Sequence, residues 1–216
     1  MTAVALNISK EEFVGNFIHQ NQLKLFEKAY RFAERCHYGH LRNDGSFYVG
    51  HPNEVCYIMI LLGITNEILL SIAICHDIVE EMFFKNGILL TKEVIAAELN
   101  WEIAEGIYAL SSLEKGESAQ QKEMRFRKIE ESVGLVLIKT IDRFVNMRRS
   151  MFGIYVSERM ERYIFETETY ILPMSERLIN SGNCECEHAL RLIRSSIKGI
   201  LEGAKLYVQV KKYERN

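Results

Sequence analysis

The chain has 216 residues, of which 48% are hydrophobic and 26% are charged, values typical of a globular domain with a sizeable core. The 27 Lys and Arg residues nearly balance the 29 Asp and Glu residues, so the formal net charge is −2. This balance argues against a strongly basic nucleic-acid binder. The apolar runs are too short for a membrane span and residues 1–10 show no secretory signal, so we expect a cytoplasmic protein.

Helices are predicted along most of the chain, because apolar residues recur with helical spacing and only two prolines are present. In chain order, we expect helices over residues 23–37, 52–62, 67–81, 91–99, 101–110, 121–131, 134–149, 157–180 and 188–210. Residues 83–90 and 111–118 are expected to be loops, and Pro173 marks a bend or a junction. The fold class is therefore all-α, with a short hairpin near residues 47–49 as the one strand-like exception.

The five cysteines favour a reduced protein without disulfides, because their number is odd. Three of them lie inside apolar segments and are expected to be core thiols: Cys36, Cys56 and Cys75. A metal site built from Cys184, Cys186 and His188 is the alternative, but no second cysteine pair supports it.

Aspartate is rare in this chain: there are 26 Glu residues and three Asp residues, Asp44, Asp77 and Asp142. Asp77 and Asp142 each follow a strongly apolar stretch, and Asp77 comes directly after His76. A buried carboxylate is costly unless it is paired, hydrogen-bonded or bound to a metal. A buried histidine hydrogen-bonded to a carboxylate is the structural alternative to a functional site.

His51, which precedes Pro52, could join His76, Asp77 and Asp142. Together these residues offer a mixed set of nitrogen and oxygen ligands. Such a set suits Mn²⁺, Fe²⁺, Co²⁺ or Zn²⁺ better than Ca²⁺ or Mg²⁺. Glu80 and Glu81 follow one helical turn after the His-Asp pair, where a carboxylate could act as general base. An exposed, solvated helix end is the alternative interpretation of these two glutamates.

Cationic residues surround the second aspartate. Asn146 lies four residues after Asp142 and is expected on the same helical face. Arginine forks suit phosphate recognition, and several arginines are near in sequence or precede His51: Arg42, Arg143, Arg148 and Arg149. A solvated basic helix end is the alternative.

The ordered motifs resemble the HD-domain metal-dependent phosphohydrolases and, more narrowly, the hydrolase domain of the RelA/SpoT alarmone family. The resemblance covers about residues 23–180 and rests on four linked motifs: His37-x-Gly39-x-x-Arg42 with Tyr48 and His51-Pro52, His76-Asp77-x-x-Glu80-Glu81, Leu137-Ile138-Lys139-x-x-Asp142-Arg143-x-x-Asn146-Met147-Arg148, and Glu166-Thr167 followed by Pro173 and Arg177-Leu178. The chain departs from the family pattern at His40, Asn43, Glu81, Ser111, Ser112 and Arg149. No departure removes a metal ligand.

The resemblance implies an HD-type helical bundle that binds one Mn²⁺ per chain through His51, His76, Asp77 and Asp142. The implied activity is removal of pyrophosphate from the ribose 3′ position of (p)ppGpp, which yields GDP or GTP. Glu80 and Glu81 match the family's acidic pair, which works on the attacking water. Arg42 and Asn146 match nucleotide-contacting positions, and the rest of the substrate site is expected to include Tyr48, Lys139, Arg143 and Arg149.

The resemblance also implies a simple domain organisation. Residues 1–180 are expected to form the hydrolase domain, and residues 181–216 a helical extension packing on it, too short for the synthetase domain of long family members. The expected partner is a nucleotide, without DNA, RNA or membrane, and self-association is left open. Two alternatives remain: an HD phosphohydrolase acting on another nucleotide such as NADPH, and a degenerate module that binds alarmone or a protein.

Overall fold

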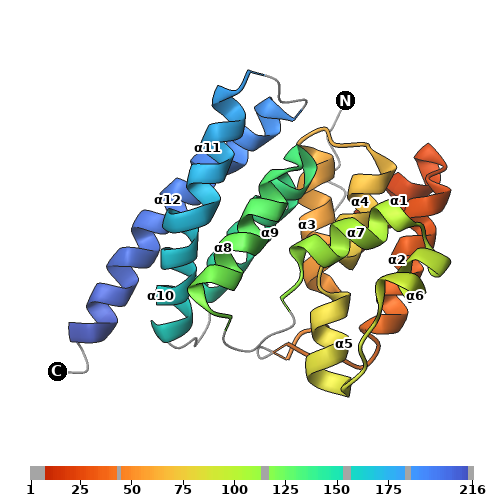
Figure 1. The fold of residues 1–216 in the computed structure, drawn as a ribbon, viewed down its shortest axis with the longest axis horizontal. Helices are drawn as coiled ribbons and strands as arrows, with labels where there is room; N and C mark the ends of the chain where they lie inside the picture. The colour runs from red at the N-terminus through yellow and green to blue at the C-terminus, as the bar shows by residue number, and fades with distance from the viewer. Residues whose placement is uncertain (1–7, 43–44, 113–116, 153–156, 183–185, 214–216) are drawn as a thin grey trace.

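The computed structural model describes residues 8–42, 45–112, 117–152, 157–182 and 186–213. Most of these residues lie in helices (Figure 1). The elements are α1 (Lys10–Asn21), α2 (Lys24–Cys36), α3 (Gly50–Leu61), α4 (Glu67–Cys75), α5 (Ile78–Asn86), α6 (Lys92–Glu98), α7 (Trp101–Leu110), α8 (Ala119–Glu130), α9 (Val133–Phe152), α10 (Ser157–Glu166), η1 (Thr167–Ile171), α11 (Leu172–Asn180) and α12 (Glu187–Tyr213). The all-α prediction is confirmed, and the hairpin is reduced to a single antiparallel bridge between Leu41 and Phe47.

Helix starts follow local capping chemistry. The Asn66 side chain accepts a hydrogen bond from the Leu69 amide at 3.0 Å, and Thr91 caps α6 in the same way. Helix α1 was not predicted, although Ser9 caps it. Only Val14 and Ile18 of this helix are buried, so its apolar pattern is too sparse to indicate a helix.

The prediction of one helix over residues 67–81 is wrong. The structure has two helices there, because the chain turns at His76 and Asp77 between α4 and α5. Both sides of the turn are apolar and buried, so the hydrophobic pattern continues through it. Helix α5 then extends to Asn86, where Gly87 adopts a positive φ of 68°, and the predicted loop therefore starts later than expected.

Residues 157–180 form one nearly continuous helical segment with a π-helical turn, η1, in the middle. The Leu172 amide donates to the carbonyl of Thr167, five residues earlier, directly before Pro173. Proline has no N–H to continue the regular ladder, so the predicted junction falls at this position.

Two apolar clusters share helix α9. The larger one joins α9 to α2, α3, α4 and α7 and contains the free, buried thiols Cys36, Cys56 and Cys75, as expected. The smaller one lies between α9, α10 and α12 and is built from Met147, Met160, Ile197, Leu201, Ala204 and Val208. Helix α9 therefore lies between the two apolar clusters and contributes buried residues to both.

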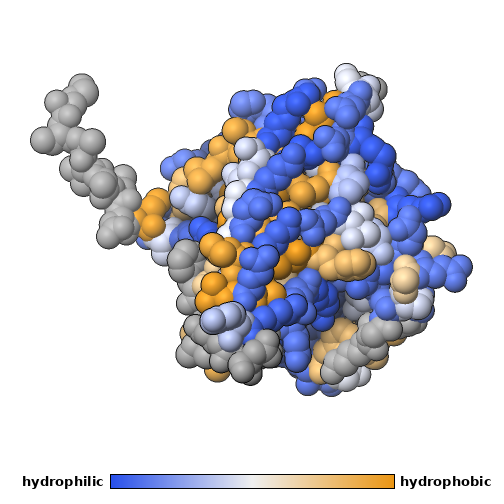
Figure 2. Space-filling view, turned by 90° about the vertical axis from the view of Figure 1, so that its left-hand side faces the viewer, coloured by the Kyte–Doolittle hydropathy of each residue, from blue (hydrophilic) through white to orange (hydrophobic). Residues whose placement is uncertain are grey.

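Helix α12 packs against α9, α10 and α11 along one side of the molecule. On this side, apolar side chains are visible between rows of hydrophilic ones (Figure 2). The division of the chain at residue 180 stays a prediction. Asn43 and Cys184 lie outside the described residues, and none of the described helices is long and apolar enough to cross a membrane.

Candidate active site

Three separate parts of the chain bring the four predicted metal ligands together. His51 comes from the first turn of α3, His76 and Asp77 from the turn between α4 and α5, and Asp142 from the middle of α9. His51 Nε2 lies 3.0 Å from Asp142 Oδ1 and 3.5 Å from Asp77 Oδ2. His76 Nε2 lies 3.1 Å from Asp77 Oδ1 and 3.6 Å from Asp142 Oδ1. The break between α4 and α5 is what turns His76 and Asp77 toward the same point.

The donor atoms of this cluster fit a cation. The Nδ1 atom of His76 lies 2.7 Å from the carbonyl oxygen of Ala73, which fixes Nδ1–H as the donor and leaves Nε2 with a lone pair. That Nε2 atom is buried and has no hydrogen-bond partner among the described residues. One ligand atom each from His51, His76 and Asp77 fall within 4.8 Å of one another. The residues present therefore suit a divalent ion with mixed nitrogen and oxygen ligands.

The local field favours positive charge at the same point. Burial disfavours the charged imidazole of His76, but the carboxylates of Asp77 and Asp142 outweigh it and raise the pKa of His76 to about 10. Burial alone would raise the pKa of Asp77, yet the adjacent His76 holds that pKa below its ordinary value. The buried carboxylate of Asp142 and the largely buried carboxylate of Asp77 share one small space, which is the electrostatic condition for binding a cation.

A cavity of about 500 Å³ opens above this cluster. Its described lining has nine basic side chains, Arg42, Lys85, Lys122, Arg125, Lys139, Arg143, Arg149, Arg159 and Arg162. It has six acidic ones, Asp77, Glu80, Glu81, Glu117, Asp142 and Glu166. The cationic excess favours an anionic ligand, and the volume is in the range of small-molecule sites. His51 and His76 are buried and do not line the cavity.

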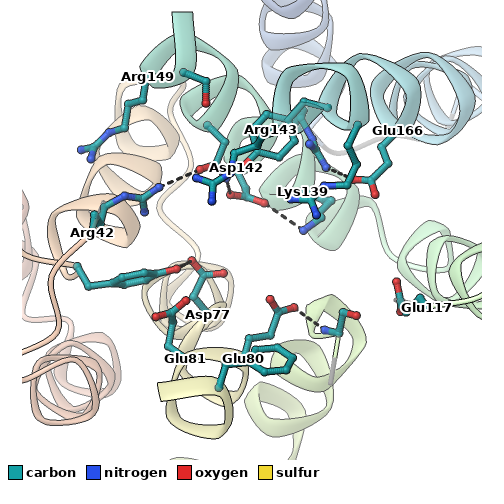
Figure 3. Close-up of a pocket in the computed structure, with 18 of the residues that line it drawn as sticks. Arg42, Asp77, Glu80, Glu81, Glu117, Lys139, Asp142, Arg143, Arg149 and Glu166 are labelled. Atoms are coloured by element: carbon teal, nitrogen blue, oxygen red, sulfur yellow. Dashed lines mark hydrogen bonds and ion pairs between the residues drawn. The ribbon is translucent and has the colours of Figure 1, made fainter. Parts of the chain in front are cut away.

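Hydrogen bonds orient the two aspartates from the cavity side (Figure 3). Tyr48 donates to Asp77 Oδ2 at 3.0 Å, and Lys139 Nζ donates to Asp142 Oδ2 at 3.1 Å. Asn146 donates to Asp142 Oδ1 at 2.5 Å. Of the predicted substrate residues, Tyr48, Lys139 and Asn146 thus contact the proposed ligands directly. Such outer contacts fix the orientation of ligand carboxylates.

The two glutamates of α5 have different surroundings. Burial and the nearby Asp77 raise the pKa of Glu80 to about 7, and its carboxylate accepts a hydrogen bond from the Ser112 amide. Glu81 Oε2 forms an ion pair with Lys85 Nζ at 3.1 Å. Both glutamates line the cavity, where Figure 3 shows them below Asp77.

The predicted arginines occupy different positions around the cavity. Arg42 donates to Asn146 Oδ1 at 3.1 Å and lies over the Tyr48 ring. Arg143 is only 4% exposed and pairs with Glu166 at 2.5 Å. Arg149 lines the cavity, and its Nε donates a hydrogen bond to Glu54 Oε2 at 3.0 Å.

The cavity wall formed by α8 and α10 was not predicted from the sequence. It supplies Lys122, Arg125, Arg159, Arg162 and Tyr163, and Glu117 from the preceding loop lies opposite Glu80. Arg159 and Arg162 stand three residues apart on α10, a spacing that puts both on one face. That spacing is a signal the sequence offered, although a solvated helix face shows the same pattern.

Proteins with similar sequences include a (p)ppGpp synthase/hydrolase and several GTP pyrophosphokinases. The chain is 26% identical over 174 residues to the bifunctional (p)ppGpp synthase/hydrolase SpoT of Escherichia coli K12, covering 79% of this chain and 24% of that protein. It is 29% identical over 163 residues to a GTP pyrophosphokinase of Streptomyces coelicolor, covering 74% of this chain and 18% of that protein. The matched part thus spans a quarter or less of these relatives' length.

The fold has a match among solved structures. A protein described as "a metazoan ortholog of SpoT" that "hydrolyzes ppGpp and plays a role in starvation responses" matches with a TM-score of 0.59 at 20% identity. The match covers 79% of this chain and 93% of that one. No protein-family model matches the chain. The resemblance to the RelA/SpoT hydrolases, and the helical fold that it implies, are confirmed.

Proposed function

We propose that this protein is a metal-dependent pyrophosphohydrolase that removes the 3′-pyrophosphate of (p)ppGpp to give GDP or GTP and pyrophosphate. The observation that carries the proposal is the convergence of His51, His76, Asp77 and Asp142 directly beneath a cavity lined by nine basic and six acidic residues. Similarity to (p)ppGpp hydrolases over 79% of the chain supports the same reaction.

The proposed metal is one Mn²⁺ per chain, the ion that the family resemblance implies; two imidazoles and two carboxylates suit Mn²⁺, Fe²⁺, Co²⁺ and Zn²⁺ alike. When bound, it would polarise the scissile phosphate and lower the pKa of water, as divalent ions do in hydrolases. Hydrogen bonds from Tyr48, Lys139 and Asn146 would hold the carboxylates of Asp77 and Asp142 in position to bind it.

Glu80 and Glu81 are proposed to manage the protons of the reaction. The attacking water gives a proton to a carboxylate while its oxygen bonds to the 3′ phosphorus, and the ribose 3′ oxygen leaves and takes up a proton. Glu81, which pairs with Lys85, is the proposed base, whereas a pKa of about 7 lets Glu80 exchange a proton near neutral pH. Arg42 and Asn146, which contact each other at 3.1 Å, are proposed to bind the phosphate.

Product analysis tests the proposal directly. The Mn²⁺-loaded protein is incubated with ppGpp, and ion-exchange chromatography is expected to show GDP and pyrophosphate in equal amounts. Release of single phosphate groups would overturn the proposed bond cleavage. Inertness toward ppGpp with turnover of NADPH would instead support a phosphohydrolase for another nucleotide.

A further inference from the structure

A buried carboxylate outside the metal cluster connects α3 to the rim of the cavity. Glu54 is 1% exposed and lies three residues after His51 on α3. Its Oε2 accepts a hydrogen bond from Arg149 Nε at 3.0 Å, and its Oε1 accepts from Lys10 Nζ and Arg148. A buried carboxylate is weak evidence for stability, since an apolar residue of similar volume often stabilises as well or better.

The charges in this group do not balance. One carboxylate faces three cations, Lys10, Arg148 and Arg149, so the group carries a net charge of +2. Of these cations, Arg149 alone lines the cavity. Its terminal guanidinium nitrogens have no hydrogen-bond partner in the described part of the chain, so they are available to an anion.

Glu54 also fixes where these nitrogens lie. Holding Nε restrains the long side chain before any ligand binds, which lowers the entropy cost of forming a bidentate contact. The same two helices carry two of the four proposed metal ligands: His51 meets Asp142, and Glu54 meets Arg149. Arg149 follows Asp142 by seven residues, which is two turns or about 10 Å along α9. The cation therefore lies beyond the point where the scissile phosphate would bind, and Figure 3 shows it at the same end of the cavity as Arg42.

We infer that Arg149 binds a second phosphate group of the substrate, distinct from the one at the metal cluster, and that Glu54 is the residue that positions it. The inference rests on the proposed function for the identity of the substrate. The phosphate is either the distal phosphate on the 3′ side or a phosphate on the 5′ side. Both sources present the same chemistry to the guanidinium.

Product binding identifies the source without relying on turnover. Calorimetry measures the affinity of the Mn²⁺-loaded protein for pyrophosphate and for GDP. We expect Arg149→Gln and Glu54→Gln each to weaken the binding of one product about 10-fold, with one Mn²⁺ per chain retained. Loss of pyrophosphate affinity places Arg149 on the 3′ side, and loss of GDP affinity places it on the 5′ side. Unchanged affinity for both products overturns the inference.

A matched control separates positioning from structure. Lys10→Met removes another partner of Glu54 that does not line the cavity, and we expect its product affinities to stay within twofold of wild type. An equal loss in Lys10→Met would overturn the positioning role. The double variant Glu54→Gln/Arg149→Gln should bind no more weakly than Arg149→Gln, because the two residues act as one unit. Additive losses would contradict that coupling.

Arg149→Lys keeps the inference testable if Glu54→Gln does not fold. Lysine keeps the charge but cannot engage Glu54 and an anion through separate nitrogens of one fork, so the same loss of affinity is expected. Wild-type affinity in this variant would overturn the inference. With steady-state kinetics, Arg149→Gln should raise KM and leave kcat within about threefold. If the protein hydrolyses ppGpp but Arg149 variants behave like wild type, only this inference is refuted. If Arg149 is needed to bind pyrophosphate but ppGpp is not hydrolysed, only the proposed function is refuted.

Discussion

Replacing Glu166 with Gln should destabilise the protein in a way that depends on pH. Burial opposes ionisation of Glu166, but Arg143 and Lys122 outweigh it and lower its pKa from 4.5 to about 2. Each pKa unit corresponds to about 1.4 kcal/mol, so this carboxylate contributes about 3 kcal/mol at neutral pH. Its side chain is only 10% exposed, so solvent screening reduces this figure little. Glu166→Gln should therefore lower the free energy of unfolding by about that amount at pH 7.

Because the pKa of Glu166 is lowered in the folded protein, its contribution to the free energy of unfolding should decrease as the pH falls. The contribution is complete above pH 4.5 and is lost as the pH falls toward 2, so the difference between wild type and variant should shrink to less than half by pH 3. Urea denaturation of the chelator-treated proteins at several pH values measures this difference. Glu187→Gln, which removes an exposed ion pair with Arg191, serves as the control and should change stability by at most about 0.5 kcal/mol. A difference that stays constant from pH 7 to pH 3 would refute the assignment of the lowered pKa to the Arg143 and Lys122 pairing.

Three further predictions concern the proposed chemistry. His76→Ala and Asp142→Ala should each lose Mn²⁺, because each removes one of four ligands, and full occupancy by elemental analysis would contradict the assignment. Glu81→Gln should retain metal and substrate binding yet lower kcat by about 10²-fold or more, whereas near-wild-type turnover would exclude it as the base. Arg42→Ala and Asn146→Ala should raise KM or lower kcat. Metal content should stay at one per chain in Arg42→Ala, and a loss of metal in that variant would place its role at the cluster instead.

The residues of the proposed metal cluster could be predicted from the sequence because each of them stands in a short local motif. His51 precedes a proline, and Asp77 and Asp142 are aspartates at the ends of apolar stretches in a chain that otherwise uses glutamate. The hydrophobic pattern could not show the turn between His76 and Asp77, since apolar residues are buried on both sides of it. The motifs thus indicate that the four proposed ligands come together. They do not indicate the backbone turn between α4 and α5 that brings His76 and Asp77 into place.

Residues whose importance depends on their tertiary partners were missed. Glu54 looks like an ordinary helical glutamate, and only the approach of α1 and α9 shows that it is buried among three cations. Glu166 was noted as part of a motif, but its pairing with Arg143 spans 23 residues of sequence. Such pairings depend on how helices pack, which helical periodicity alone does not specify.

Because α9 lies between both apolar clusters, the tolerance of this protein to mutation should differ between the two faces of α12. Residues such as Leu201 and Ala204 pack in the cluster shared with α9, the helix that carries Asp142 and Asn146. Substitutions at these two positions would shift helix α9, and with it Asp142 and Asn146, although Leu201 and Ala204 do not line the cavity. Leu206 and Tyr213 on the same helix are 61% and 86% exposed. In a genetic screen for lost activity, hits should therefore repeat with helical spacing along the α9-facing side of α12.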